Sequence, residues 1–283
     1  MIPHSFSYLA PRSVGDVVGL LSADSMLLGG GTWVVPVLGD PRTRVARVID
    51  LRHAGLAGIE DRGDRVFLGA MVTYTDLLRS AAAPSLLRLV AGGVTGGPQI
   101  QGQGTIGGSA CAAKPSSDIP CALLALDAVA TVRGPAGVRG MPAARLWLAP
   151  FHTTLAEDEV LTGFEVPVRR GGHCGVAYRK LKCGTSSWPI VTVAVVAAVD
   201  GAGALTELRI AVGAAAAVPF SVPTHDLVGS APSTALVEEL AERARVALTD
   251  PWTDEIAPAE YRTAVLPTIV RRAVTDAVED CRA

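Results

Sequence analysis

The 283-residue sequence has few aromatic residues, no long apolar run and no strong excess of charge. Phe, Trp and Tyr make up only 5% of the chain while hydrophobic residues make up 49%, so we expect a core built mainly from Ala, Val and Leu. No segment reaches about 18 uninterrupted apolar residues, and the N-terminus has no basic region followed by an apolar stretch. We therefore expect a cytoplasmic protein without a membrane span.

The charge and the cysteine spacing argue against a nucleic-acid-binding, a disulfide-rich or a metal-binding protein. The formal net charge is −2 and no run of Lys or Arg stands out, which argues against a nucleic-acid partner. The five cysteines include no C-x-x-C pair, which argues against a disulfide framework, a zinc site or ferredoxin-type cluster ligands. We predict no metal site here, and any iron–sulfur chemistry would belong to another chain. The cysteines are Cys111, Cys121, Cys174, Cys183 and Cys281.

Apolar patterns divide the chain into an α/β part and a later, different part. Before residue 169, β-like runs such as 65–73 alternate with helical stretches, and Ser13 is expected to cap a helix that begins at Val14. The stretch Arg169–Gly172 is the best boundary candidate. Beyond it, three long β-like runs precede helical stretches near 236–248 and 259–278, as in a separate α+β lobe.

Two glycine-rich segments interrupt the apolar runs. Gly29-Gly30-Gly31-Thr32 and Thr105-Ile106-Gly107-Gly108-Ser109 each expose bare backbone, and successive amides in such turns can bind a diphosphate. Each segment could equally be an ordinary turn. We expect the two loops to face each other as clusters of exposed N–H groups.

Two other features near the second loop are open to more than one interpretation. Gly102, Gly104 and Gly107 match G-x-G-x-x-G, but no strand precedes them and Pro115 follows too soon for the Rossmann helix. Asp118 could accept hydrogen bonds from sugar or ribityl hydroxyls, or it could cap a helix that starts near Pro120. From these residues alone, a nucleotide or flavin diphosphate site is the preferred hypothesis.

The same segments carry a family resemblance. GGGTWVVP resembles the A-G-G-H-S-L-L-P loop, and GTIGGSACAAKPSSDIPCALLALDA resembles the G-T-I-G-G-N segment, of the FAD-binding medium subunit of molybdenum hydroxylases, the xanthine dehydrogenase and carbon monoxide dehydrogenase family. Matches continue in order along nearly the whole chain. They comprise IDL, LGAMVTYTDLL, DEVLTGFEVP, AYRKLK, LRIAVGAAAAVPF and AEYRTAVLPTIVRRA.

The resemblance implies an α+β fold and three parts. Residues 1–55 and 56–170 would form the two lobes of a PCMH-type FAD-binding domain. Residues 171–283 would form the C-terminal domain of the CO dehydrogenase flavoprotein type, with a three-stranded antiparallel sheet and helices. FAD would be clasped between the first two lobes.

The resemblance also implies the FAD contacts. The two loops would hold the diphosphate, Asp118 would meet cofactor hydroxyls, and Val160 and Leu161 would lie beside the flavin. Lys180 would lie near the isoalloxazine and stabilise negative charge on the reduced ring, unless it is simply an exposed strand lysine. No catalytic residue is implied. The expected contacts are Leu28, Gly29, Gly30, Gly31, Thr32, Trp33, Val34, Thr105, Ile106, Gly107, Gly108, Ser109, Cys111, Asp118, Val160, Leu161 and Lys180.

The sequence departs from the family pattern at several of these places. Trp33 is the most consequential departure, because its indole could stack on a ligand, narrow the access to the site or simply fill the core. Thr32 and Trp33 replace His-Ser, Gln101 and Gly102 stand where R-N is common, Lys114 replaces the acid before Pro115, and Cys183 stands where Arg is frequent.

The resemblance favours one function over two others. As an FAD-dependent oxidoreductase component, the chain would receive electrons from molybdopterin and iron–sulfur partner subunits and deliver them to NAD, oxygen or a quinone. The departures and the unusual segment Gly184–Ile190 leave open a free-standing FAD oxidase or dehydrogenase. A third possibility is a cofactor-free scaffold subunit. The substrate and the oligomeric state are not predicted.

Overall fold

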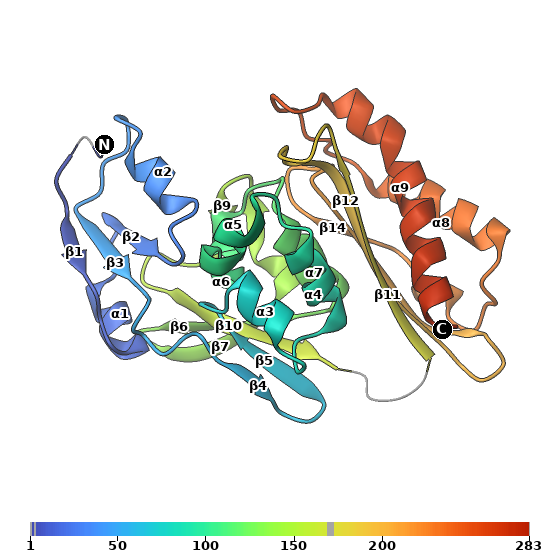
Figure 1. Ribbon diagram of the computed structural model, residues 1–283, viewed down its shortest axis with the longest axis horizontal. Helices are drawn as coiled ribbons and strands as arrows, with labels where there is room; N and C mark the ends of the chain where they lie inside the picture. The colour runs from blue at the N-terminus through green and yellow to red at the C-terminus, as the bar shows by residue number, and fades with distance from the viewer. Residues whose placement is uncertain (1, 3, 169–172, 283) are drawn as a thin grey trace.

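The computed structural model describes residue 2, residues 4–168 and residues 173–282. Three larger sheets and one two-stranded sheet are formed by the described residues, and helices pack between and outside the three larger sheets (Figure 1). The predicted boundary at Arg169–Gly172 lies outside the described residues. The division at residues 55 and 170 stays a prediction.

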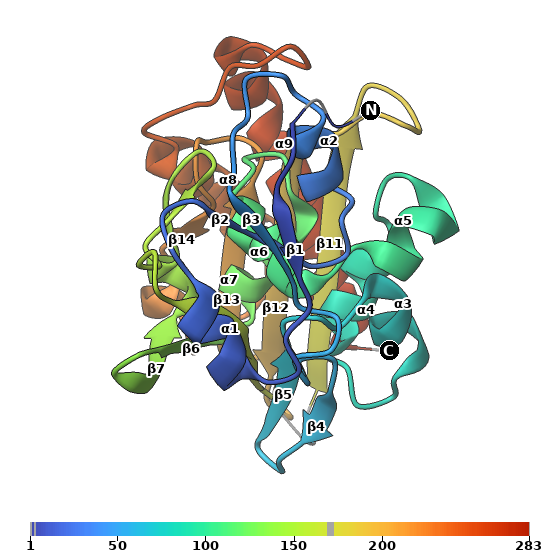
Figure 2. The same cartoon turned by 90° about the vertical axis from the view of Figure 1, so that its left-hand side faces the viewer.

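The first sheet is small and wholly parallel. Its strand order is β1-β3-β2, and the central strand β3 buries Val48 and Ile49. Ser13 caps α1 as expected, since its hydroxyl accepts the N–H of Asp16. Figure 2 shows this sheet facing the viewer. The elements are β1 (Ser7–Leu9), α1 (Val14–Leu20), β2 (Ser25–Leu28), α2 (Val34–Leu38) and β3 (Arg47–Asp50).

The second sheet is antiparallel, in the order β4-β5-β10-β6-β7. Its strands are β4 (Ile59–Asp61), β5 (Arg65–Gly69), β6 (Val129–Gly134), β7 (Gly137–Pro142) and β10 (Val160–Pro167). A short hairpin, β8 (Trp147–Ala149) with β9 (His152–Thr153), follows the 3₁₀ turn η1 (Ala143–Arg145).

A group of five helices packs beside the second sheet, between it and the third sheet (Figure 1). Apart from Asp118, its first residue, the helix α7 is apolar, and all of its residues are buried, as expected of a helix enclosed by packing on every side. The helices are α3 (Tyr74–Arg79), α4 (Ser85–Gly92), α5 (Gly97–Gln103), α6 (Ile106–Ala112) and α7 (Asp118–Ala125).

The third sheet is antiparallel and explains the long apolar run in its second strand. Helix α7 packs against β12 and β13, while α9 packs against β11 and β12, so ten of the eleven β12 residues are buried. A strand covered on both faces needs no polar alternation. The strands are β11 (His173–Lys182), β12 (Pro189–Val199), β13 (Leu205–Gly213) and β14 (Phe220–Val222); the helices are α8 (Thr234–Ala247), α9 (Ala259–Asp280) and the 3₁₀ turn η2 (His225–Leu227).

The three predicted long strands of this lobe are β11, β12 and β13. The sheet also has a fourth strand, β14, which the sequence prediction did not include. Its three residues are too few to show a period-2 pattern, and its backbone pairs with β13. The G-x-G-x-x-G match runs from the end of α5 into α6 rather than from a strand into a helix, so the Rossmann interpretation is excluded.

Candidate flavin-binding site

A cavity of about 810 Å³ is lined by segments from all three parts of the chain. The volume lies within the roughly 300–1,000 Å³ of ordinary small-molecule and cofactor sites. The walls come from the loop after β2, residues 70–74, helix α6, the start of β10 and the β11–β12 turn. The expected contacts that line it are Gly29, Gly30, Gly31, Thr32, Trp33, Val34, Thr105, Gly107, Gly108, Ser109, Cys111, Asp118, Val160 and Leu161.

Three expected contacts are not among the lining residues. Leu28 is the last residue of β2, one position before the first glycine loop. Ile106 is fully buried in the hydrophobic core. Lys180 lies behind Asp118 and reaches it with its ammonium group. The structure thus brings both glycine loops to one cavity but places these three side chains outside its wall.

The first glycine loop has backbone amides free to bind an anion. The five successive N–H groups of Gly30–Val34 donate no hydrogen bond to a described residue. Gly31 has φ +76°, the left-handed conformation that favours glycine. The preceding residues form a strand and the following ones a helix, so the loop is held at both ends. Free amides on such a turn suit the diphosphate of a flavin dinucleotide.

The second glycine loop differs from the expectation. Its amides are already used: Gly107 donates to the Ala70 carbonyl at 2.9 Å, and Gly108 donates to Thr105 Oγ1 at 3.1 Å. Ser109 donates to the Thr105 carbonyl. The prediction of a second cluster of exposed N–H groups is therefore wrong, because Thr105 accepts the amides of Gly108 and Ser109 while the Ala70 carbonyl accepts that of Gly107. This loop shapes the wall instead.

Asp118 joins the helical region to the third sheet. It is the first residue of α7, whose N-cap is Ser117, so the capping role predicted for Asp118 is wrong. Its carboxylate accepts the Tyr178 hydroxyl at 2.5 Å and the Lys180 ammonium at 2.9 Å. Burial and the nearby Asp118 charge raise the pKa of Tyr178 well above its ordinary value, so this phenol stays protonated.

Lys180 is not the exposed strand lysine considered above. Only 9% of its side chain is exposed, against 7% for Asp118, and its Nζ also donates to the Gly93 carbonyl at 3.2 Å. The ammonium group therefore neutralises the Asp118 carboxylate that lines the cavity. The Asp118 side of the cavity is therefore electrically neutral before any ligand enters.

The apolar wall of the cavity comes from β10 and α6. Val160 and Leu161 are 1% and 3% exposed at the start of β10. Cys111 faces the cavity, which makes it accessible to solvent, but protein surrounds it and burial raises the pKa of its thiol to about 12. A thiol with that pKa stays protonated at neutral pH, so Cys111 forms part of the cavity wall and does not act as a nucleophile.

The structure adds cavity residues that sequence reasoning did not assign. Lys114, Phe151 and Trp188 line the cavity, as do Met71 and Tyr74 beneath the loops. Two signals were present in the sequence: Lys114 departs from the family pattern, and Trp188 lies in the unusual segment Gly184–Ile190. Nothing in the sequence indicated that these two residues meet.

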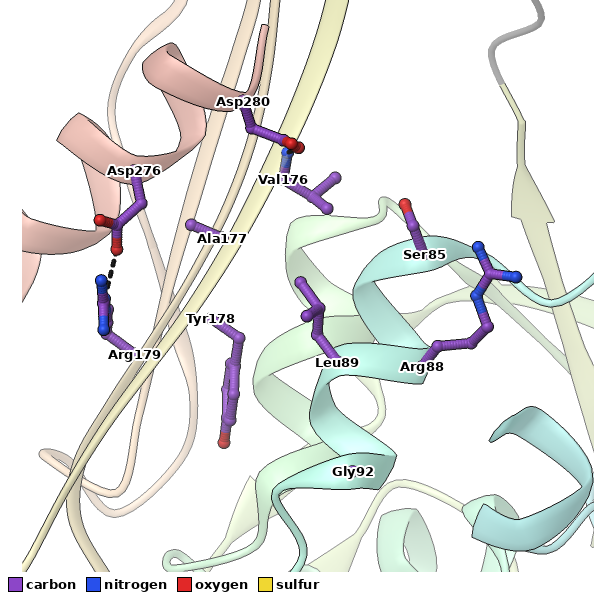
Figure 3. Close-up of a pocket in the computed structure, with 10 residues that line it drawn as sticks. All are labelled: Ser85, Arg88, Leu89, Gly92, Val176, Ala177, Tyr178, Arg179, Asp276 and Asp280. Carbon is purple, nitrogen blue, oxygen red and sulfur yellow. Dashed lines mark hydrogen bonds and ion pairs between the residues drawn. The ribbon is translucent and has the colours of Figure 1, made fainter. Parts of the chain in front are cut away.

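A second, more open pocket lies between α4, β11 and α9 (Figure 3). Its charged residue Arg179 is paired with Asp276, and Asp280 accepts the backbone N–H of Val176. Arg88 is turned away from β11. The Tyr178 ring borders this pocket, while its hydroxyl reaches Asp118.

The described part of the chain has neither a cluster of metal ligands nor a membrane-spanning helix. No group of three or more His, Cys, Asp or Glu residues there is arranged to hold a metal ion. Within the same residues, no helix combines the length and apolarity needed to cross a membrane.

Two family models together match most of the chain. Residues 4–169 match the FAD binding domain in molybdopterin dehydrogenase, and residues 176–277 match the CO dehydrogenase flavoprotein C-terminal domain. The carbon monoxide dehydrogenase medium chain of Hydrogenophaga pseudoflava is 34% identical, over 99% of this chain and 100% of its own length. The nicotine 6-hydroxylase medium subunit of Paenarthrobacter nicotinovorans is 32% identical, over 95% and 96%.

The similarity extends to three dimensions. A solved structure of carbon monoxide dehydrogenase from Hydrogenophaga pseudoflava, which lacks the Mo-pyranopterin moiety of the molybdenum cofactor, contains a chain that superposes with a TM-score of 0.93. The two chains are 33% identical, and the match covers 99% of this chain and 100% of the other. Fold and domain order are therefore shared over the full length.

Proposed function

We propose a role for a chain that belongs, through both of its domains, to the FAD-binding subunits of the molybdenum hydroxylases. It is the flavoprotein component of an oxidoreductase complex, and its cofactor is FAD. Electrons reach it from an iron–sulfur subunit that is itself supplied by a molybdopterin subunit, and they leave to an external acceptor. The names of the relatives, "medium chain" and "medium subunit", support a chain that works with partners.

The observation that carries the proposal is the cavity with its free amides. The N–H groups of Gly30–Val34 would hold the FAD diphosphate. The other expected contacts that line the cavity would enclose the rest of the cofactor. Bound FAD supplies two-electron and one-electron redox chemistry in one group. This chain's residues supply the binding, the orientation and the electrostatic surroundings. The same proposal places the complex in the cytoplasm, on the sequence grounds given above.

The first prediction tests this role by co-expression. The purified chain alone should be yellow and contain about one FAD per polypeptide, and it should co-purify with iron-bearing and molybdenum-bearing chains encoded with it. Any small molecule that the complex oxidises should reduce the flavin in the complex but not in the isolated chain. NAD, oxygen and a quinone are then offered separately as acceptors.

Two results would contradict it. A colourless chain that takes up no FAD would contradict the proposal that FAD is its cofactor. Reduction of the flavin by a small molecule in the isolated chain, without partners, would select the free-standing oxidase or dehydrogenase instead.

A further inference from the structure

Lys114 lies at the mouth of the cavity between two indole rings. Its Nζ is 3.7 Å from the centroid of the Trp188 ring and 5.1 Å from that of Trp33. Phe151 stacks on Trp33, with centroids 5.9 Å apart and planes 9° from parallel. Trp188 and Phe151 are each nearly half exposed, which sets them at the rim. We call these four residues the Lys114 cluster.

The backbone that presents Lys114 is held in an unusual conformation. Ala113, immediately before it, has φ +44°, and its carbonyl accepts the N–H of Phe151, which itself has φ +64°. On the other side, Ala214 has φ +61° and donates to the Pro115 carbonyl at 3.1 Å. These are three of the four non-glycine residues with positive φ in the described chain. Such conformations persist where surrounding structure over-determines them, often at binding sites.

Lys114 is a cation without a counter-charge. Its ammonium group makes no hydrogen bond or ion pair with any described residue, and burial lowers its pKa. The acids that act on it from a distance are Asp254 and Glu255, and Asp254 is already paired with Arg262. The other charged side chain in the cavity wall, Asp118, is balanced by Lys180. The described cavity wall therefore carries one unbalanced positive charge.

That charge lies beside the loop with the free amides. Trp33, whose ring faces the ammonium group, belongs to the same run of unpaired N–H donors, Gly30–Val34. A half-buried cation next to five free amides is complementary in charge and hydrogen bonding to an anionic ligand. The two indoles stabilise the ammonium group through cation–π contacts and restrict its motion. Its position is therefore set by the Lys114 cluster and not by solvent.

We propose that Lys114, clamped by Trp33 and Trp188, supplies the counter-charge for the diphosphate of the bound flavin dinucleotide. The inference rests on the proposed function, because it takes the cavity to be the FAD site. It adds a lysine where the family resemblance gives an acid, so this chain would balance its cofactor's charge with a residue that the family pattern lacks.

The second prediction compares ligands that share the isoalloxazine ring and differ in their phosphates: none in riboflavin, one in FMN, and in FAD a diphosphate that also carries adenosine. Riboflavin, FMN and FAD are titrated into the cofactor-free full-length chain and into Lys114→Met. The variant should bind FAD about ten- to a hundredfold more weakly, the range expected for loss of one charge-assisted contact. Its riboflavin affinity should match that of the unaltered chain. Lys114→Arg should retain most of the FAD affinity, and that affinity should fall with added salt more steeply in the unaltered chain than in Lys114→Met.

The control is Lys182→Met, which removes the same charge from a lysine whose Nζ donates to the Thr185 carbonyl outside the cavity. Melting of each cofactor-free variant shows whether it is folded. If Lys114→Met bound FAD like the unaltered chain, or lost riboflavin and FAD affinity equally, the diphosphate role would be overturned while the FAD site stood. If the unaltered chain bound no FAD, the proposed function would fall, and this inference with it.

Discussion

At the scale of single residues, Gly30 is where the first glycine loop touches the end of α5. A Cβ at this position would lie 1.5 Å from the Gln103 carbonyl oxygen and 2.5 Å from its carbon. These are backbone atoms, so no side-chain rotation can relieve the overlap. The glycine is thus required by a contact between two protein segments, in addition to any approach of a ligand.

The third prediction follows from that contact. Gly30→Ala should lower the free energy of unfolding by about 1–3 kcal/mol, as overpacking does, and should weaken FAD binding because the loop must move. Chemical unfolding of the cofactor-free chain and an FAD titration measure the two effects. Gly184→Ala is the matched control, since nothing lies within 4 Å of its added Cβ. Equal stability of the two variants would refute the packing argument.

At the scale of elements, α9 is tied to the third sheet by a buried arginine. Arg262 is fully buried, and its Nη1 donates to the Ile190 and Ala214 carbonyls, each at 2.6 Å. It also pairs with Asp254. One side chain thus links α9 to the start of β12, to the residue after β13 and to the loop before α9. Through Ala214 it also supports the backbone beside Lys114.

The fourth prediction separates this buried arginine from a surface one on the same helix. Arg262→Met should cost about 3–5 kcal/mol, because it leaves Asp254 without its paired cation and removes the donor of three backbone carbonyls, which include that of Ala257 at 3.3 Å. Arg271→Met removes an exposed pair with Glu238 and should change the stability little. Urea unfolding of both variants is the measurement. A small cost for Arg262→Met would show that water replaces its contacts.

At the scale of the whole molecule, the Asp118–Lys180 pair connects the helical region beside the second sheet to the third sheet. The two residues are 62 positions apart, and each side chain is more than nine-tenths buried. Removing one partner leaves the other as a buried, unpaired charge. The pair therefore serves two ends: it fixes how α7 meets β11, and it neutralises the carboxylate in the cavity wall.

The fifth prediction is a double-mutant cycle on this pair. Asp118→Asn and Lys180→Met should each lower the free energy of unfolding, by up to about 3–5 kcal/mol, and the double variant should lose less than the sum. Unfolding is followed without cofactor, so that FAD contacts do not enter. Arg179→Met, on the adjacent residue of β11, should show no coupling to Asp118→Asn. Additive effects for Asp118 and Lys180 would mean that the pair contributes nothing jointly.

Local chemistry determined what could be predicted from the sequence by itself. Ser13 begins a helix because its hydroxyl can cap one, the three long apolar runs are strands, and the glycine loops lie where apolar strands and helices end. The family resemblance, based on the loop residues, predicted the fold and the cofactor, and the comparisons confirm both. These are properties of short segments, which carry their own periodicity and capping residues.

Only the tertiary structure decided which distant side chains meet. Nearby residues left Asp118 open either as an acceptor for cofactor hydroxyls or as a helix cap, whereas packing brings its carboxylate to Tyr178 and Lys180 of the third sheet. In the sequence, Lys114 was a departure from the family pattern and Trp188 lay in an unusual segment, and nothing connected them until the fold placed the ammonium group over the Trp188 ring. A loop side chain has no period to reveal its partner, and its contacts depend on how the sheets and helices pack, which is a property of the whole chain.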